Sequence, residues 1–194
     1  MSTGVFLSVQ ESYVPNARSV ALSLVAAVNE KLGELGQQPM EDPVKGPHVC
    51  EGRTGLDHIG SASLRKLGEL AGEERAHVHL LALNPYRLVY APRSFERPQV
   101  TRHREDLAGQ TVNVLLGSSL HLRDELLDLA PDLGIPLEGG VLGDEVAKKI
   151  DDLEPLHEGE SDWDLVEGTR VAWHILHEAA LLSIERDVPI SLAG

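Results

Sequence analysis

Eight carboxylates and no lysine or arginine lie in residues 151–167, and this acidic run is the part of the chain best equipped for chemistry. Carboxylates pair with Lys and Arg side chains and accelerate the encounter with a positively charged partner. The run therefore predicts a face that binds a basic protein. We expect its contacts to come from seven residues: Glu154, Glu158, Glu160, Asp162, Trp163, Asp164 and Glu167.

Two other interpretations of the acidic run stay open. The carboxylates could belong to an exposed turn and helix start, where negative charge suits the positive end of the helix dipole. The alternating acids from Glu158 to Asp164 could also hold Ca²⁺, although the run lacks the Asp-x-Asp-x-Asp-Gly pattern and the closing Glu of an EF-hand loop. Trp163 either anchors the partner or packs in the core beside Val166 and Trp173.

Histidines offer a second, catalytic chemistry. His174 and His177 lie three residues apart in a predicted helix and could share a metal ion with His157 or His121. Their sequence, His-Ile-Leu-His-Glu, matches neither zinc-protease pattern, H-E-x-x-H or H-x-x-E-H. A simpler interpretation is a polar helix stripe held by i,i+4 pairs, formed by Glu167, Arg170, His174 and Glu178. We therefore assign no catalytic residue, no metal ligand and no cofactor, and keep His174 and His177 as candidates for a metal-dependent hydrolase.

Two shorter motifs carry weaker signals. His77 and His79 alternate in a predicted strand, so they share a face that could bind zinc if a third ligand joined them; a half-exposed strand face is the simpler interpretation. Gly117-Ser118-Ser119 lies between a predicted strand and a predicted helix. We expect one of these serines to cap the helix rather than to help bind an anion.

The net charge of −14 is confined to the end of the chain. Residues 1–123 hold 13 acids and 13 bases, whereas residues 124–194 hold 18 acids and four bases. Such a surface repels nucleic acids and membranes, so we expect neither as a partner. We expect some arginines of residues 87–104 to pair with the acidic region inside the fold. A single cysteine, Cys50, permits no intrachain disulfide, and the N-terminus lacks a signal-peptide pattern, which predicts a cytoplasmic protein.

Periodicity predicts the elements that must position these residues. We expect helices at 16–36, 61–71, 119–129, 144–150 and 161–186, and strands at 5–9, 77–83, 87–91, 112–116 and 188–192. Residues 37–57 and 131–143 are rich in Pro and Gly and are predicted as long loops. Because strands and helices do not alternate cleanly, this order favours an α+β fold. We expect one domain over residues 1–194, with a mixed sheet of about four to five strands and a long C-terminal helix.

The sequence thus predicts an acidic cytoplasmic binding protein that masks a basic partner. Its most concrete form is an immunity-type inhibitor of a bacterial toxin, whose positive cleft the acidic run would occlude. The alternatives are the small metal-dependent hydrolase built on His174 and His177, and a scaffold protein that forms homo-oligomers through its long helix.

Overall fold

The computed structural model describes residues 2–13, 15–46, 58–72, 77–83, 88–105, 110–151 and 162–193. A six-stranded mixed sheet forms its centre, with the strand order β2-β1-β8-β3-β5-β4. These strands are β1 (Ser2–Phe6), β2 (His58–Gly60), β3 (Leu88–Ala91), β4 (Gln99–Glu105), β5 (Gln110–Ser118) and β8 (Ile190–Ala193). β3 and β5 run parallel, whereas the other neighbouring pairs run antiparallel.

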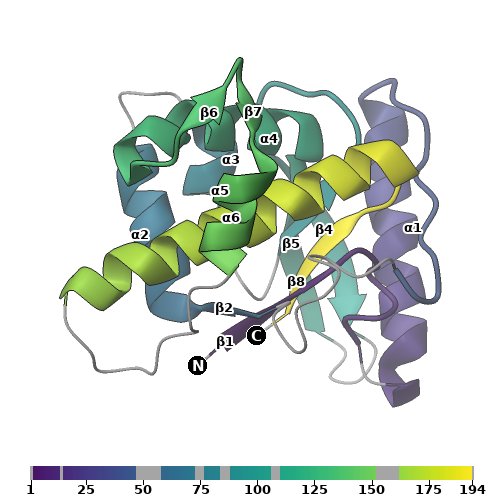
Figure 1. Cartoon of the computed structure of the whole chain (residues 1–194). Helices are drawn as coiled ribbons and strands as arrows, with labels where there is room; N and C mark the ends of the chain where they lie inside the picture. Colours follow the sequence, from purple (N-terminus) through teal and green to yellow (C-terminus); the bar gives the residue numbers. More distant parts are fainter. Residues whose placement is uncertain are drawn as a thin grey trace.

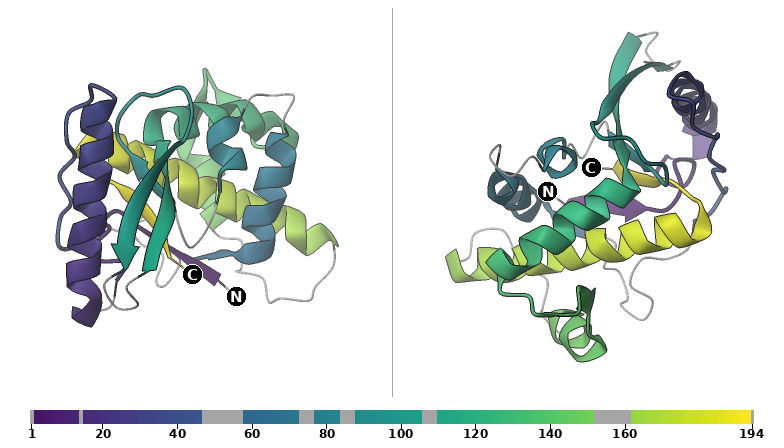
Figure 2. Two further views of the ribbon diagram at one scale, coloured as in Figure 1. Left: turned by 180° about the vertical axis from the view of Figure 1, so that it is seen from behind. Right: turned by 90° about the horizontal axis from the view of Figure 1, so that it is seen from above.

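Helices cover both faces of this sheet (Figures 1 and 2). One face carries α1 (Arg18–Glu34), which follows the short η1 (Pro15–Ala17). The other carries α2 (Ser61–Ala71), α3 (Val78–Leu81), α4 (Ser119–Leu129) and α6 (Asp162–Arg186). Between α4 and α6 the chain forms η3 (Ala130–Leu133), a hairpin of β6 (Leu137–Glu138) and β7 (Val141–Leu142), and α5 (Asp144–Asp151). The hairpin and α5 lie on the side of α6 that faces away from the sheet (Figure 2).

Burial on both faces explains the composition of the central strands. Successive side chains of a strand point to opposite faces. In β3, Leu88 and Tyr90 join the core under α4 and α6, while Val89 and Ala91 join the core under α1. All four positions are buried, so β3 reads as a continuous apolar run rather than as an alternating one.

Helix α6 is the central element of the larger core. It buries apolar side chains on most of its surface: Val171, Ala172, Trp173, Ile175, Leu176, Ala179 and Ala180. Trp173 is fully buried, and its Nε1 donates a hydrogen bond to the Leu126 carbonyl of α4 at 2.6 Å. This bond ties α4 to α6 near the middle of both helices.

The α+β fold, the mixed sheet and the long C-terminal helix are confirmed, although the sheet has six strands where about four to five were predicted. β4 was not predicted, and the loop predicted at 131–143 contains the β6–β7 hairpin. Gly139 and Gly140, both with positive φ, form the tight turn of that hairpin. Residues 37–46 contain no helix or strand, and 47–57 lie outside the described residues. In the part of the chain that is described, no helix is long and apolar enough to cross a membrane.

The strand predicted at 77–83 is wrong, because Val78–Leu81 forms helix α3. The carboxylate of Glu125 on α4 accepts hydrogen bonds from the backbone N–H groups of His79 and Leu80, at 3.1 and 2.8 Å. These amides at the helix start would otherwise lack partners. A helix cap from a residue more than 40 positions away therefore decides the conformation, and local periodicity could not reveal it.

Candidate functional site

The acid-rich part of the chain is centred on one region, which we call the acidic lobe and define as residues 124–167. It holds 15 acids and two bases, Lys148 and Lys149, and so accounts for a charge of −13 out of the total of −14. Its described part comprises α4 from Asp124 onward, η3, the β6–β7 hairpin, α5 and the first turns of α6. The acids of this described part therefore lie on α4, η3, the hairpin, α5 and the start of α6 (Figure 1).

A row of three aspartates runs along α4 and η3. Asp124, Asp128 and Asp132 are spaced four residues apart and are all exposed. Residues four apart lie on the same side of a helix, separated by about 6 Å along its axis. The side chain of Asp124 contacts Arg123 at 2.6 Å, and that of Asp128 contacts Nε2 of His77 at 2.9 Å. Both carboxylates nevertheless remain more than half exposed.

Further carboxylates extend this surface onto the hairpin and α5. Glu138 is exposed beside the hairpin turn, and Asp144 and Glu145 are exposed in the first turn of α5. Lys148 and Lys149 lie in the last turn of the same helix. This order suits the helix dipole, because acids stabilise its N-terminal end and bases its C-terminal end. These acids were not among the contact residues predicted from the sequence, although the four-residue spacing of Asp124, Asp128 and Asp132 is visible there.

The structure describes only some of the seven contact residues predicted from the sequence. Glu154, Glu158 and Glu160 lie outside the described residues. Asp162, Trp163 and Asp164 belong to the first turn of α6, where the backbone alone is described. Glu167 lies further along α6 and is half-buried. Partner binding by these seven residues therefore stays a prediction.

Helix α4 is held in place by contacts to α3 and to the preceding strand. Ser118 caps α4 as predicted, because its Oγ accepts the His121 N–H at 3.3 Å. Glu125 is buried and caps α3, so α3 and α4 are locked together. Burial raises the pKa of Glu125, and the two N–H donors from α3 oppose that rise. The aspartates of α4 thus project from a helix with a fixed position.

His79 forms the buried centre of this junction. Its Nδ1 accepts the Ser118 backbone N–H at 3.1 Å, and its ring stacks on His121 with 5.3 Å between ring centroids. Burial, together with the nearby His121, lowers the pKa of His79 from 6.5 to about 4. His79 is therefore neutral at neutral pH. The face shared by His77 and His79, predicted for a strand, does not exist because both residues belong to the start of α3.

The histidines of α6 are packing residues in this structure. His174 and His177 are almost fully buried, so the solvated polar stripe expected through His174 is wrong. His177 stacks on Trp173 with 4.9 Å between centroids, and His177 and His174 lower the pKa of the half-buried Glu178 against its desolvation. Among the described residues, no group of three His, Cys, Asp or Glu side chains is placed to hold a metal ion. The hydrolase alternative therefore gains no support.

One predicted pairing between the arginine-rich stretch and the C-terminal region is confirmed. Arg93 forms an ion pair with Asp187, which follows α6 with a positive φ of 56°. The same guanidinium donates to the carbonyls of Gln38 and Pro39 at 2.9 and 2.8 Å. Arg93 thereby clamps the segment after α1 to the end of α6, away from the acidic lobe.

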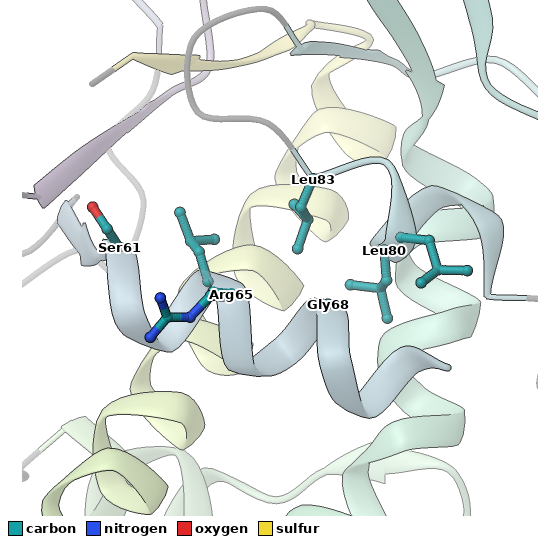
Figure 3. A pocket seen from close by; sticks show the side chains of 7 residues that line it. Ser61, Arg65, Gly68, Leu80 and Leu83 are labelled. Atoms are coloured by element: carbon teal, nitrogen blue, oxygen red, sulfur yellow. The ribbon is translucent and has the colours of Figure 1, made fainter. Parts of the chain in front are cut away.

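An apolar groove lies between α2 and α3 (Figure 3). It has a volume of about 260 Å³ and is lined mainly by Leu64, Leu80, Leu81 and Leu83, with Arg65 at its rim. Arg65 pairs with Glu69 on the next turn of α2. An apolar hollow with so few polar groups does not resemble a catalytic site, which needs several converging polar groups.

Residues 19–192 match a protein family described as "Putative DNA-mimic protein". Comparison with curated proteins and with solved structures gives no match. A DNA mimic is an acidic protein that takes the place of nucleic acid on a protein. The family match contradicts both the predicted toxin-like basic partner and the expectation of no link to nucleic acid, because a DNA mimic binds a DNA-binding protein. Negative charge repels DNA itself but attracts the positive surface that DNA occupies on a protein.

Proposed function

This chain belongs to the DNA-mimic protein family, and from that premise we propose that its acidic lobe occupies the DNA-binding surface of a protein partner. The observation that carries the proposal is the placement of the charge. The lobe holds 15 of the 31 acidic residues in fewer than a quarter of the positions of the chain. DNA-binding surfaces gather Lys and Arg to neutralise phosphates, and the same side chains can pair with carboxylates.

The spacing of the α4 aspartates supports this role. Consecutive phosphates of one B-DNA strand rise by about 3.4 Å along the axis and, at a radius of roughly 10 Å, lie about 7 Å apart. Asp124 and Asp128 follow one another at about 6 Å along the axis of α4, and Asp132 comes next in the chain, in η3. A row of carboxylates with this spacing offers a partner a sequence of anionic contacts similar to that of one DNA strand.

Rigidity of the scaffold also favours the proposal. Binding loses less free energy when the contact groups are already held in place. The Ser118 cap, the Glu125 bonds to α3 and the Trp173 bond to Leu126 fix α4 from three sides. The charges of the row therefore need little ordering when the partner arrives. We propose that the predicted acidic run, from Glu154 to Glu167, extends the same binding surface.

Competition with DNA tests this proposal. The purified full-length chain is immobilised, proteins from its native lysate are bound at low salt, and the captured protein is released with a duplex of about 20 base pairs. Polyglutamate at the same charge concentration serves as the control, because simple ion exchange would release the protein equally with either polymer. We expect specific release by the duplex, and we expect the released protein to bind that duplex when purified.

A matched pair of triple variants tests which carboxylates take part. Asp124→Asn, Asp128→Asn and Asp132→Asn together neutralise the row, and Glu30→Gln, Glu34→Gln and Glu69→Gln remove the same charge from exposed sites elsewhere. We expect the first variant to bind the partner about tenfold more weakly and the second to bind within twofold of the wild type. Equal weakening by both would mean that net charge, and not this surface, governs binding.

A further inference from the structure

A pocket inside the acidic lobe has a character opposite to its surroundings. It lies between the segment after η3, α5 and the first half of α6, and has a volume of about 230 Å³. Its lining consists of Gly134, Ile135, Pro136, Val146, Lys149, Ile150 and Arg170. Among the described residues, no carboxylate belongs to this lining, although the lobe around it carries 15 acids. The pocket therefore combines an apolar wall with two cations in an otherwise anionic region.

The two cations differ in how firmly they are held. Arg170 is half-buried, and its Nε donates to the Leu133 carbonyl at 2.7 Å, which fixes the guanidinium at the pocket wall. Lys149 is exposed at the end of α5 and is long enough to bend toward the opening. These two side chains are two of the four bases in residues 124–194, so their presence in one pocket is not a consequence of abundance.

The pocket backbone has no free N–H donor at Gly134, Ile135 or Pro136. The N–H of Gly134 already donates to Pro131 at 3.0 Å, and that of Ile135 donates to Ala130 at 2.9 Å. Pro136 has no N–H group. Recognition of an anion here therefore depends on Arg170 and Lys149 alone. The N–H donors of these two side chains can pair with both oxygens of a carboxylate, and the apolar remainder of the lining favours a ligand that carries one such group on an apolar body.

From this geometry we infer that the pocket binds a small apolar carboxylate. The carboxylate pairs with Arg170 and Lys149, and the apolar part contacts Ile135, Val146 and Ile150. A cavity of about 150 Å³ accepts a benzene ring, so a pocket of about 230 Å³ has room for a six-membered ring with its carboxylate. This ligand site is separate from the proposed binding of a DNA-binding protein, and neither depends on the other.

Titration with benzoate, followed by methyl NMR of the full chain, tests the inference. We expect saturable shifts of the Ile135, Val146 and Ile150 methyl signals, and no comparable shifts with benzamide, which has the same ring but no charge. Lys149→Met should weaken benzoate binding by about tenfold, because a charge-assisted contact is lost. Lys148→Met is the matched control, since Lys148 is the preceding residue of the same helix and does not line the pocket.

Arg170→Met is the second informative variant, and we expect it to abolish saturable benzoate binding. If the loss of the Leu133 contact unfolds this variant, the comparison between Lys149→Met and Lys148→Met decides alone. Three results would overturn the inference: no saturable shift in the wild type, equal binding of benzamide, or equal weakening by the two lysine variants. A failure of the DNA-competition experiment would leave the benzoate result unchanged, so the two proposals fail separately.

Discussion

Replacing His79 with asparagine changes how the stability of the protein depends on pH. His79 is fully buried and neutral in the folded state, with a pKa of about 4, whereas an unfolded histidine has a pKa of 6.5. The unfolded chain therefore binds a proton at this residue before the folded chain does. Stability is lost as the pH falls through 6.5, and the loss continues until the pH reaches the folded-state pKa. Asparagine does not titrate and removes this contribution.

The magnitude follows from the two pKa values. The pKa of His79 is 6.5 in the unfolded chain and about 4 in the folded protein. Proton linkage with these two values lowers the free energy of unfolding by about 1.3 kcal/mol when the pH falls from 7.5 to 5.5. This pH range stays above the isoelectric point of about 5.0, where the protein would lose solubility. The wild type should be more stable than the variant at pH 7.5, because asparagine leaves part of the ring volume empty and loses the stack on His121. That advantage should shrink by about 1.3 kcal/mol at pH 5.5.

Urea unfolding followed by far-ultraviolet circular dichroism at the two pH values measures this change. His58→Asn provides the control, since it makes the same substitution at an exposed histidine on β2. A difference between wild type and His79→Asn that is equal at pH 7.5 and pH 5.5 would refute the reasoning. It would mean that His79 is not buried as a neutral side chain at the α3–α4 junction.

Two further predictions concern the contacts that hold the scaffold together. Trp173→Phe removes the donor to the Leu126 carbonyl and part of a fully buried ring. Urea unfolding should therefore show that the free energy of unfolding falls by about 2–4 kcal/mol. A fall of less than about 1 kcal/mol would contradict the assigned role of Trp173. Arg93→Met breaks the ion pair with Asp187 and the hydrogen bonds to the carbonyls of Gln38 and Pro39, and it should lower the free energy of unfolding by about 2 kcal/mol. The control Arg97→Met changes an exposed arginine and should alter the free energy of unfolding by no more than about 0.5 kcal/mol. Equal effects of the two arginine variants would argue against the clamp.

The sequence predicted those elements whose signals are local. Ser118 precedes an amphipathic run and caps α4, as its position suggested. The 25 residues of α6 carry a helical pattern long enough to be recognised without tertiary information. Helix α3 depends on the distant Glu125, and so could not be predicted.

Strand β4 was missed because its buried side chains are polar. Thr101 and His103 point toward α1, where Thr101 donates to the Ala27 carbonyl at 3.2 Å, while Val100 and Arg102 are exposed. The strand therefore alternates between buried and exposed positions, but its buried positions hold polar residues. A search for alternating apolar residues does not find it.

The functional prediction succeeded for charge and failed for the identity of the partner. An acidic surface that binds a protein could be inferred from the excess of carboxylates in residues 124–194. The pairing of Arg93 with Asp187 could also be anticipated from composition. That the positive surface on the partner belongs to a DNA-binding protein depends on the family match and not on any local spacing.

The most direct test of this account is displacement of DNA by the protein. A labelled duplex is bound to the purified partner, and fluorescence anisotropy is followed while the chain is added at constant ionic strength. We predict that the anisotropy falls to the value of the free duplex, and that the chain concentration needed rises in proportion to added unlabelled duplex. A stable complex that contains partner, duplex and chain together would contradict the account, because a DNA mimic and DNA cannot occupy the same surface at once.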